Sequence, residues 1–317
     1  MKARILACLV AGLVLAFSGG CGQKAAAPTN VKTEASFLEL QDAAGRTVVL
    51  PKPPQRVVAL SPSYLEIIDA IGGSLVGRPA SQNGRIPESM AKLPEVGLTY
   101  NINMETVVGL KPDLVLAGKN QHDKFVKLLE TNNIPTIEFN AKTLDEVKAL
   151  VLDLGRVYSK REAAKKLCEK LDSDIAAIKA KLPKEDKPKR IVIMFATASS
   201  VSVANSKSVA GCVSDMLGFE NVAAKALQGH SEKTPYSMEA LLEQNPDLIF
   251  ITSMGKPKKI EERLRKDFRD NPAWNSLKAV QEKKIFVLPE NLFLLNPGIH
   301  YPEAVAYMAQ KVYPDLK

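Results

Sequence analysis

The chain has 317 residues, of which 45% are hydrophobic and 25% are charged, and its formal net charge is +8 at pH 7. This composition is ordinary for a folded globular protein, and the length allows two lobes with separate cores. The positive charge can attract anionic small molecules or anionic lipid, and a solvated basic surface is the simpler alternative. The charge does not favour nucleic acid, because the lysines are scattered and no aromatic residues interleave with them.

Residues 1–21 have the layout of a bacterial secretion signal. Two basic residues precede the apolar run 5–17, and a Ser-Gly-Gly triplet then leads to Cys21. The run is too short to span a bilayer. We therefore expect lipid attachment at Cys21 and an extracytoplasmic protein anchored to the cell membrane, at a periplasmic or outer face. An ordinary cleaved signal is the alternative. Residues 22–36 lack periodicity and predict a disordered tether.

Short strands alternate with helices through the first part of the chain, which predicts an α/β lobe. Alternating segments around a turn with a glycine predict a hairpin, and short apolar runs predict buried parallel strands. In chain order, we expect a hairpin at 37–40 and 47–50, a strand at 56–60, a helix at 61–71, a strand at 75–77, a loop at 78–100, a helix at 104–110, a strand at 114–117, a helix at 121–132 and a strand at 134–139.

A long helical run then follows, with apolar residues at steps of three and four. Thr143 with Glu146, and Ser159 with Glu162, fit capping boxes and divide the run into two helices. The second is about 34 Å long at a rise of about 1.5 Å per residue, which favours a rigid strut between two α/β halves. A long helix inside a single domain is the alternative. The predicted helices cover 144–158 and 160–182.

Strand and helix patterns resume after the strut. We expect strands at 190–196, 248–252 and 284–288, and helices at 208–217, 238–242, 257–269, 274–280 and 301–312. The predicted division is a signal at 1–21, a tether at 22–36, an amino-terminal lobe at 37–158, a connecting helix at 159–183 and a carboxy-terminal lobe at 184–317. Cys168 and Cys212 lack the spacing of a metal site, and both free thiols and a disulfide stay open.

One pattern occurs in both halves. A capped helix with Glu105 one residue inside it turns through Pro-Asp into a strand, and Glu239 occupies the same place in the second half. Two halves built alike imply a cleft between them, where ligands bind in open α/β sheets.

No phosphate-loop, zinc-protease, nucleophile-elbow or dinucleotide motif occurs, which argues against an enzyme. The three histidines are too far apart in sequence to form a local metal site, so we expect neither a directly bound metal nor a cofactor. Residues after predicted strands face the cleft best, and Tyr, His and Met can each ligate haem iron. For each of them, packing or plain exposure is the simpler alternative. The candidate ligand-binding residues after predicted strands are Ser61, Ser63, Tyr64, Lys119, His122, Asn205, Met254, Asn296 and His300, and a further candidate, Tyr100, lies in the loop before the helix at 104–110.

With these residues in view, the chain resembles the substrate-binding proteins of ABC importers that take up ferric siderophores, haem and cobalamin. The segments that carry the resemblance are 56–72, 75–79, 96–117, the helical run, 237–251 and 274–304. The resemblance implies two α/β lobes joined by one rigid helix, a monomeric receptor and no catalysis. It also implies that Glu105 and Glu239 dock onto arginines of a permease dimer, which works with its ATPase.

The resemblance implies an iron complex as the transported ligand. Residues 250–314 are most similar to Gram-positive haem-binding members, which place an axial Met after a Val-Gly pair and an axial His after a later strand. This chain has Tyr100 or Leu98 at the first place and Met254 at the second. Because other haem-binding members use a single tyrosine, Tyr100 is the candidate axial ligand to a bound iron complex.

Two other ligands remain open. Many siderophore-binding members carry an arginine where this chain has His300, and the periplasmic cobalamin receptor surrounds the corrin with aromatic residues. The single tryptophan here, Trp274, lies in a structural motif. We therefore expect a ferric siderophore or haem, with cobalamin as the alternative.

Overall fold

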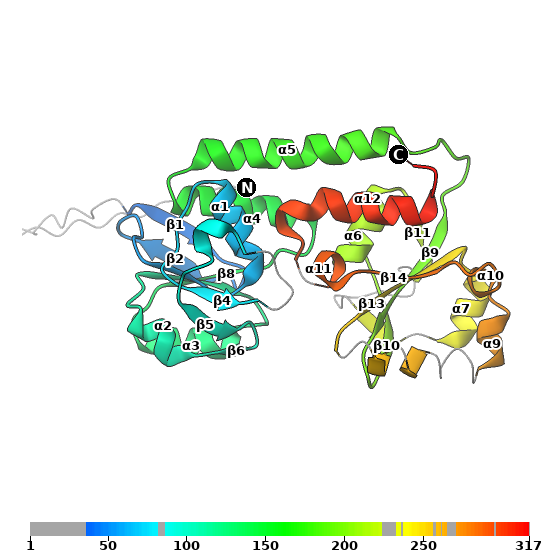
Figure 1. Ribbon diagram of the computed structural model, residues 1–317, viewed down its shortest axis with the longest axis horizontal. Coiled ribbons are helices and arrows are strands. Elements are labelled where there is room, and N and C mark those ends of the chain that lie inside the picture. Colours follow the sequence, from blue (N-terminus) through cyan, green and yellow to red (C-terminus); the bar gives the residue numbers. More distant parts are fainter. Residues whose placement is uncertain are drawn as a thin grey trace, which may run out of the picture. The chain divides into compact units, whose positions relative to one another are not determined.

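The computed structural model describes residues 36–316, except for 82–85, 224–232, 236, 256–257, 261, 265–270 and 295. The signal expected at 1–21 and almost all of the tether expected at 22–36 lie outside the described residues. Ser36–Lys317 forms one compact unit (Figure 1). Within the described residues, no helix is both long and apolar enough to cross a membrane.

The first half of this unit contains small sheets covered by helices. A parallel sheet has the strand order β3-β7-β8, a second sheet has the order β4-β5-β6, and β1 pairs with β2 as the predicted hairpin. The strands are β1 (Leu38–Gln41), β2 (Thr47–Leu50), β3 (Val57–Ala59), β4 (Arg78–Ala80), β5 (Glu95–Leu98), β6 (Asn101–Ile102), β7 (Leu114–Gly118) and β8 (Thr136–Phe139). The helices are η1 (Pro62–Tyr64), α1 (Leu65–Ala70), η2 (Glu88–Met90), α2 (Met104–Gly109) and α3 (Asp123–Thr131).

The second half is built around one mixed sheet with the order β12-β10-β9-β13-β14, and β11 also pairs with β9. The strands β9, β13 and β14 run parallel, whereas β10 and β12 are antiparallel additions. Its strands are β9 (Arg190–Ala196), β10 (Val201–Ala204), β11 (Glu220–Asn221), β12 (Lys233–Pro235), β13 (Leu248–Ser253) and β14 (Ile285–Val287). Its helices include α6 (Val209–Met216), α7 (Met238–Gln244), α9 (Pro272–Asn275), α10 (Lys278–Gln281), α11 (Glu290–Phe293), η4 (Gly298–His300) and α12 (Tyr301–Val312).

The helix α5 (Arg161–Ala180) packs against α4 (Leu144–Val157) and against α12, as Figure 1 shows. Its buried side chains include Ala164 and Cys168. A Cβ atom at Gly155 of α4 would lie 2.4 Å from the Ala164 Cβ, so a glycine is required where α4 and α5 approach. One apolar core continues through these helices and contains Val57 of the first half and Phe250 of the second. At about 1.5 Å per residue, α5 is about 30 Å long.

The sequence pattern shared by the halves has a shared structural role. Asp113 accepts a hydrogen bond from the Arg56 backbone N–H at 2.8 Å, just before β3. Asp247 accepts one from the Arg190 backbone N–H at 3.1 Å, where β9 begins. In both halves, the aspartate before one buried parallel strand therefore holds the start of its neighbour. This contact supplies a partner for a backbone donor at the end of the ladder.

The predicted α/β class is confirmed, and so are most of the elements, including the hairpin, α4, α5 and α12. The loop expected at 78–100 is wrong, because it contains β4, η2 and β5, and the strand expected at 75–77 forms only a single bridge through Gly77. β10 and β12 were not predicted. β12 is short and polar, whereas β10 has an alternating Val-Ser-Val-Ala pattern but only four residues. Much of the helix expected at 257–269 lies outside the described residues.

One of the two predicted caps is present. The Thr143 hydroxyl accepts a hydrogen bond from the Glu146 backbone N–H, and the Glu146 carboxylate accepts the Thr143 N–H in return, which completes the capping box. The cap predicted at Ser159 is wrong. Ser159 has a φ of 56°, in the left-handed region, whereas an N-cap residue has extended backbone. Lys160 precedes α5 instead, without a side-chain cap.

Replacing the cap residue tests this difference. Thr143→Ala should lower the free energy of unfolding by about 1 kcal/mol, because the first turn of α4 loses its side-chain acceptor. As the matched control, Ser159→Gly should leave stability unchanged or raise it slightly, since glycine adopts a positive φ without strain. Urea unfolding followed by circular dichroism measures both changes. Equal losses in the two variants would contradict this assignment of the helix starts.

Candidate functional site

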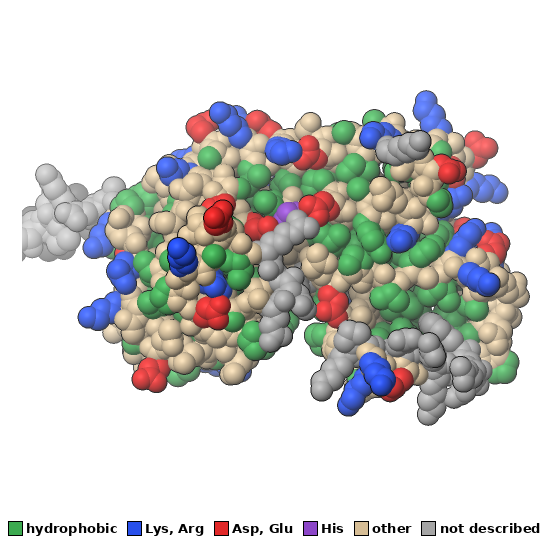
Figure 2. All heavy atoms as spheres, viewed as in Figure 1, with side chains coloured by type: hydrophobic (Ala, Val, Ile, Leu, Met, Phe, Trp, Pro, Cys, Tyr) green, Lys and Arg blue, Asp and Glu red, His purple; other side chains and the backbone are tan. Residues whose placement is uncertain are grey.

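A cavity of about 340 Å³ lies where parallel strands from both halves end. Its walls include the residues that directly follow β3, β7 and β8, together with Phe195 of β9 and Thr252 of β13. The carboxyl ends of parallel strands meet at one edge of a sheet, which is where ligands bind in open α/β folds. On the face shown in Figure 2, the surface is hollowed between the two halves. The volume falls in the usual range of small-molecule sites, about 300–1,000 Å³.

The charged groups in the lining are all positive. Lys119, Lys142 and Lys233 line the cavity and are half-buried. Among the lining residues that the structure describes there is no Asp, Glu, His or Cys. The Lys119 ammonium donates a hydrogen bond to the Ala43 carbonyl at 2.5 Å, and the Lys233 ammonium lies 3.4 Å from the centre of the Phe195 ring. Partial burial strengthens the field of such charges.

Two side chains that can ligate iron are exposed at the cavity. Tyr100 is 59% exposed and lies in the turn between β5 and β6, and Met254 is 47% exposed and directly follows β13. Among the described residues, no group hydrogen-bonds the Tyr100 hydroxyl. The oxygen of one residue and the sulfur of the other are thus available to a bound molecule.

Tyr64 and Ser61 line the same cavity but are buried. The Tyr64 hydroxyl donates a hydrogen bond to the Ala117 carbonyl at 3.0 Å, and its ring meets Phe139 edge-on at 5.9 Å. Burial raises the pKa of Tyr64 far above its ordinary value, and the nearby Glu138 carboxylate adds to the rise. Tyr64 therefore stays protonated, and the hydrogen bond from its hydroxyl stabilises the end of β7.

Of the remaining candidates, His122 and Asn205 lie outside the described lining, whereas Asn296 belongs to it. His122 is fully buried and bonds only to backbone groups. The Asn205 side-chain oxygen accepts the Lys207 backbone N–H at 3.0 Å, next to the lining residues Ala204 and Ser208. Asn296 does line the cavity, and its buried amide nitrogen has no hydrogen-bond partner among the described residues.

His300 connects elements of the two halves. Its Nε2 lies 2.8 Å from the Glu66 carboxylate of α1, and its Nδ1 lies 2.6 Å from the Glu303 carboxylate of α12. These two acidic side chains lie outside the lining, and through them His300 links α1 with η4 and α12.

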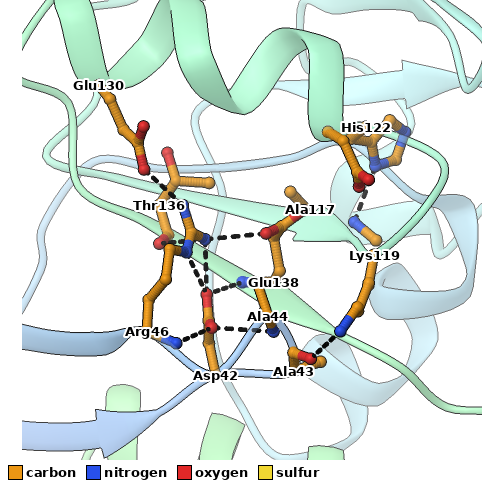
Figure 3. Close-up of polar contacts among 12 residues, drawn as sticks. Asp42, Ala43, Ala44, Arg46, Ala117, Lys119, His122, Glu130, Thr136 and Glu138 are labelled. Carbon is orange, nitrogen blue, oxygen red and sulfur yellow. Dashed lines mark hydrogen bonds and ion pairs between the residues drawn. The ribbon is translucent and has the colours of Figure 1, made fainter.

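Behind the wall formed by Lys119, a charged network holds the β1–β2 hairpin against β8 (Figure 3). Arg46 pairs with Asp42, Glu130 and Glu138. Burial raises the pKa of Glu138, and Arg46 opposes that rise. Burial also acts to raise the pKa of Asp42, but the hydrogen bond from Arg46 and two backbone N–H groups outweigh it, so that pKa is lowered. Lys119 is thus bonded, through the Ala43 carbonyl, to a hairpin that this network holds in place.

Several lining residues were not among the candidates. Lys142 follows β8 just as Lys119 follows β7, so the rule of strand ends would have found it. Lys233 lies in β12, in a polar stretch without a usable pattern. Phe139, Phe195 and Phe293 line the cavity as well, although each is typical of a core residue in sequence.

The residues expected to dock a permease are both exposed at helix starts. Glu105 follows the cap residue Asn103, which accepts the Thr106 backbone N–H at 3.1 Å. Glu239 follows Ser237, whose hydroxyl accepts the Ala240 N–H and donates to the Glu239 carboxylate at 2.7 Å. The hydrogen bond from Ser237 lowers the pKa of Glu239. Both acids are thus presented to solvent in the same local setting. Cys21 lies outside the described residues.

Residues 57–292 match the family model described as periplasmic binding protein. The chain belongs to this family. The match includes α4, α5 and most of the cavity lining. As a member, it is a substrate-binding protein of the ABC-importer type and not an enzyme.

Individual relatives of this periplasmic binding protein agree with the assignment. The high-affinity heme uptake system protein IsdE of Staphylococcus aureus is 27% identical over 263 residues, which cover 83% of this chain and 88% of IsdE. The structure of IsdE complexed with heme has a TM-score of 0.72 at 25% identity and covers 81% of this chain and 98% of IsdE. In IsdE, heme is thus the ligand of an uptake protein, not a catalytic cofactor.

Two further structures share the fold. An ABC transporter substrate-binding protein from Listeria monocytogenes has a TM-score of 0.74 at 26% identity, covering 83% of this chain and all of its own. Staphylococcus aureus SirA, complexed with staphyloferrin B, has a TM-score of 0.72 at 22% identity and covers 87% of this chain and 98% of SirA. The periplasmic-binding fold of two α/β halves with small parallel sheets is therefore confirmed.

Proposed function

We propose that this protein captures an anionic iron complex, either haem or an anionic ferric siderophore, and delivers it to the permease of an ABC importer. One observation carries the proposal: the cavity lining contains Lys119, Lys142 and Lys233 and, in its described part, no acidic side chain. Such a cavity suits carboxylate groups on a ligand, because each lysine supplies a positive charge.

The same lining argues against the capture of a bare metal ion. Within the described part of the chain, no group of three His, Cys, Asp or Glu side chains is placed to hold a metal. An iron atom must then arrive inside an organic ligand. Tyr100 and Met254 are the exposed side chains that could reach such an iron, and we assign Tyr100 the larger role because a phenolate is a hard ligand suited to ferric iron.

The relatives support this ligand class without deciding between its members. IsdE is described as a heme uptake protein, and SirA was solved with staphyloferrin B. SirA is similar only at the level of the fold, and no feature of the cavity favours cobalamin. Whichever complex is transported, it would be a ligand that a monomeric receptor holds between its halves.

The location completes the proposal. Acylation of Cys21 would anchor the protein, with residues 22–35 as the link to the folded unit at Ser36. Two or more acyl chains give a stable anchor, whereas one chain gives only reversible binding. The receptor would then work on the extracytoplasmic side, next to the permease.

The charge of the ligand provides the first test. Purified protein should bind haem and ferric citrate, which carry carboxylates, and should reject ferrioxamine B, a cationic ferric hydroxamate, because the lysines repel it. Visible absorption and quenching of tryptophan fluorescence measure the titrations, with cobalamin as a further arm. Binding of ferrioxamine B as tight as that of haem would contradict the assigned role of the lysines. Binding of cobalamin alone would overturn the iron complex.

A pair of tyrosine variants tests the iron contact. Tyr100→Phe should weaken haem binding about tenfold or more and shift the visible spectrum, while the melting temperature stays close to that of the parent. Tyr64→Phe is the matched control, since it also removes a hydroxyl from the lining. It should instead lower stability by about 1 kcal/mol, because the Ala117 carbonyl loses its donor, and leave the haem spectrum unchanged. Unchanged haem binding by Tyr100→Phe would remove Tyr100 from the site.

A second pair of variants tests docking. Glu105→Gln combined with Glu239→Gln should leave haem affinity intact and sharply reduce stimulation of the cognate transporter's ATPase, because exposed charges guide the encounter with a cationic partner. The control, Glu88→Gln with Glu243→Gln, changes one exposed acid in each half and should have no effect. The difference between the two double variants should shrink as salt rises, since the Debye length is about 8 Å at physiological ionic strength. Full stimulation by the first pair would limit both residues to helping their helices begin.

A further inference from the structure

His122 joins two segments of the cavity wall that are distant in sequence. It lies between β7 and α3, and none of its surface is exposed. Its Nδ1 is 2.8 Å from the Gly118 backbone nitrogen, and its Nε2 is 2.9 Å from the Thr99 carbonyl oxygen. Gly118 and Thr99 both line the cavity, and Thr99 directly precedes Tyr100.

The partners of the ring determine its protonation state. A backbone N–H only donates, so the Nδ1 that faces Gly118 must accept and carries no hydrogen. A carbonyl only accepts, so the Nε2 that faces Thr99 must carry the hydrogen. The neutral Nε2–H tautomer alone satisfies both contacts. Burial lowers the pKa of His122, although the hydrogen bond to Thr99 and the charge of Asp123 oppose the change.

The end of β7, where Gly118 bonds the His122 ring, is itself held in place by close contacts. A Cβ atom at Gly118 would lie 3.5 Å from the His122 Nδ1, 3.5 Å from the Tyr64 hydroxyl and 2.8 Å from the Gln121 side-chain oxygen. Tyr64 bonds the carbonyl of Ala117 and His122 bonds the N–H of the next residue. The end of β7 is thus a braced support, whereas the turn between β5 and β6 is short and carries the exposed Tyr100.

We propose that His122 is a positioning residue: its neutral imidazole ties the Thr99–Tyr100 turn to the braced end of β7 and so sets where Tyr100 meets the ligand. The ring itself touches no ligand. The part of the inference that concerns affinity rests on the proposed function, because it treats an iron complex as the ligand of Tyr100.

Two variants of similar size separate the two hydrogen bonds. In His122→Gln the side-chain amide nitrogen can take the place of Nε2 and donate to the Thr99 carbonyl, but the contact with the Gly118 N–H is lost. In His122→Asn the side-chain oxygen can take the place of Nδ1 and accept from Gly118, but the side chain is too short to reach Thr99. Each variant therefore loses one buried hydrogen bond, and their melting temperatures should fall by similar amounts.

Ligand binding and local exchange should separate the variants. His122→Gln should bind haem nearly as the parent does, whereas His122→Asn should bind it about tenfold more weakly. In ligand-free protein, the peptide that covers 97–102 should exchange its amide hydrogens faster in His122→Asn than in His122→Gln, and the Gly118 amide should show the opposite order. A purely structural role would instead give equal losses of affinity and stability.

Several outcomes would overturn the inference. Equal haem affinities in the two variants, or equal exchange over 97–102, would show that the bond to Thr99 does not position Tyr100. If neither variant folds, nitrogen NMR of the parent protein still decides, because a hydrogen on Nδ1 would contradict the required tautomer. If the parent binds no iron complex, the proposed function fails, but exchange in the ligand-free variants still tests the tie to Thr99.

Discussion

The cavity depends on the apolar contact of α5 with both α4 and α12. Its walls come from the ends of strands in two halves of the chain, so it exists only if those halves are held in a fixed relation. The core that runs through these helices contains residues of both halves, such as Val57 and Phe250, and burial of that area is the main stabilising term available. At the closest point, the small residues Gly155 and Ala164 bring α4 and α5 into contact.

The same type of hydrogen bond stabilises the start of a strand in each half. Asp113 and Asp247 each hold the start of a neighbouring parallel strand, and each strand that follows them leads to the cavity. The Pro-Asp pattern in the sequence therefore marks the entry of the strands, and their ends carry Lys119 and Met254. The fold thus places two segments at one cavity although more than a hundred residues separate them.

The sequence predicted regular elements well where hydrophobic periodicity coincided with a local signal, as at Thr143. It failed at Ser159, because a Ser-x-x-Glu pattern does not report the positive φ that rules out a cap there. The strand-end rule led to Met254, whereas Tyr100 was a candidate from the loop before the helix at 104–110, and neither route could find Lys233. Lys233 reaches the cavity through the pairing of β12 with β10, and β12 is a polar segment without a hydrophobic pattern.

The residues around this cavity differ in role because their hydrogen-bond partners differ, not because their residue types differ. Tyr64 and Tyr100 both line it, but the Tyr64 hydroxyl is committed to the Ala117 carbonyl, whereas the Tyr100 side chain is largely exposed. Most buried polar groups have a hydrogen-bond partner, and the buried Tyr64 and His122 both find theirs in the backbone. Through these hydrogen bonds, Tyr64 and His122 hold the backbone of the cavity wall in place. A rigid support matters here because a ligand contact from a short turn is only as well placed as the backbone that carries it.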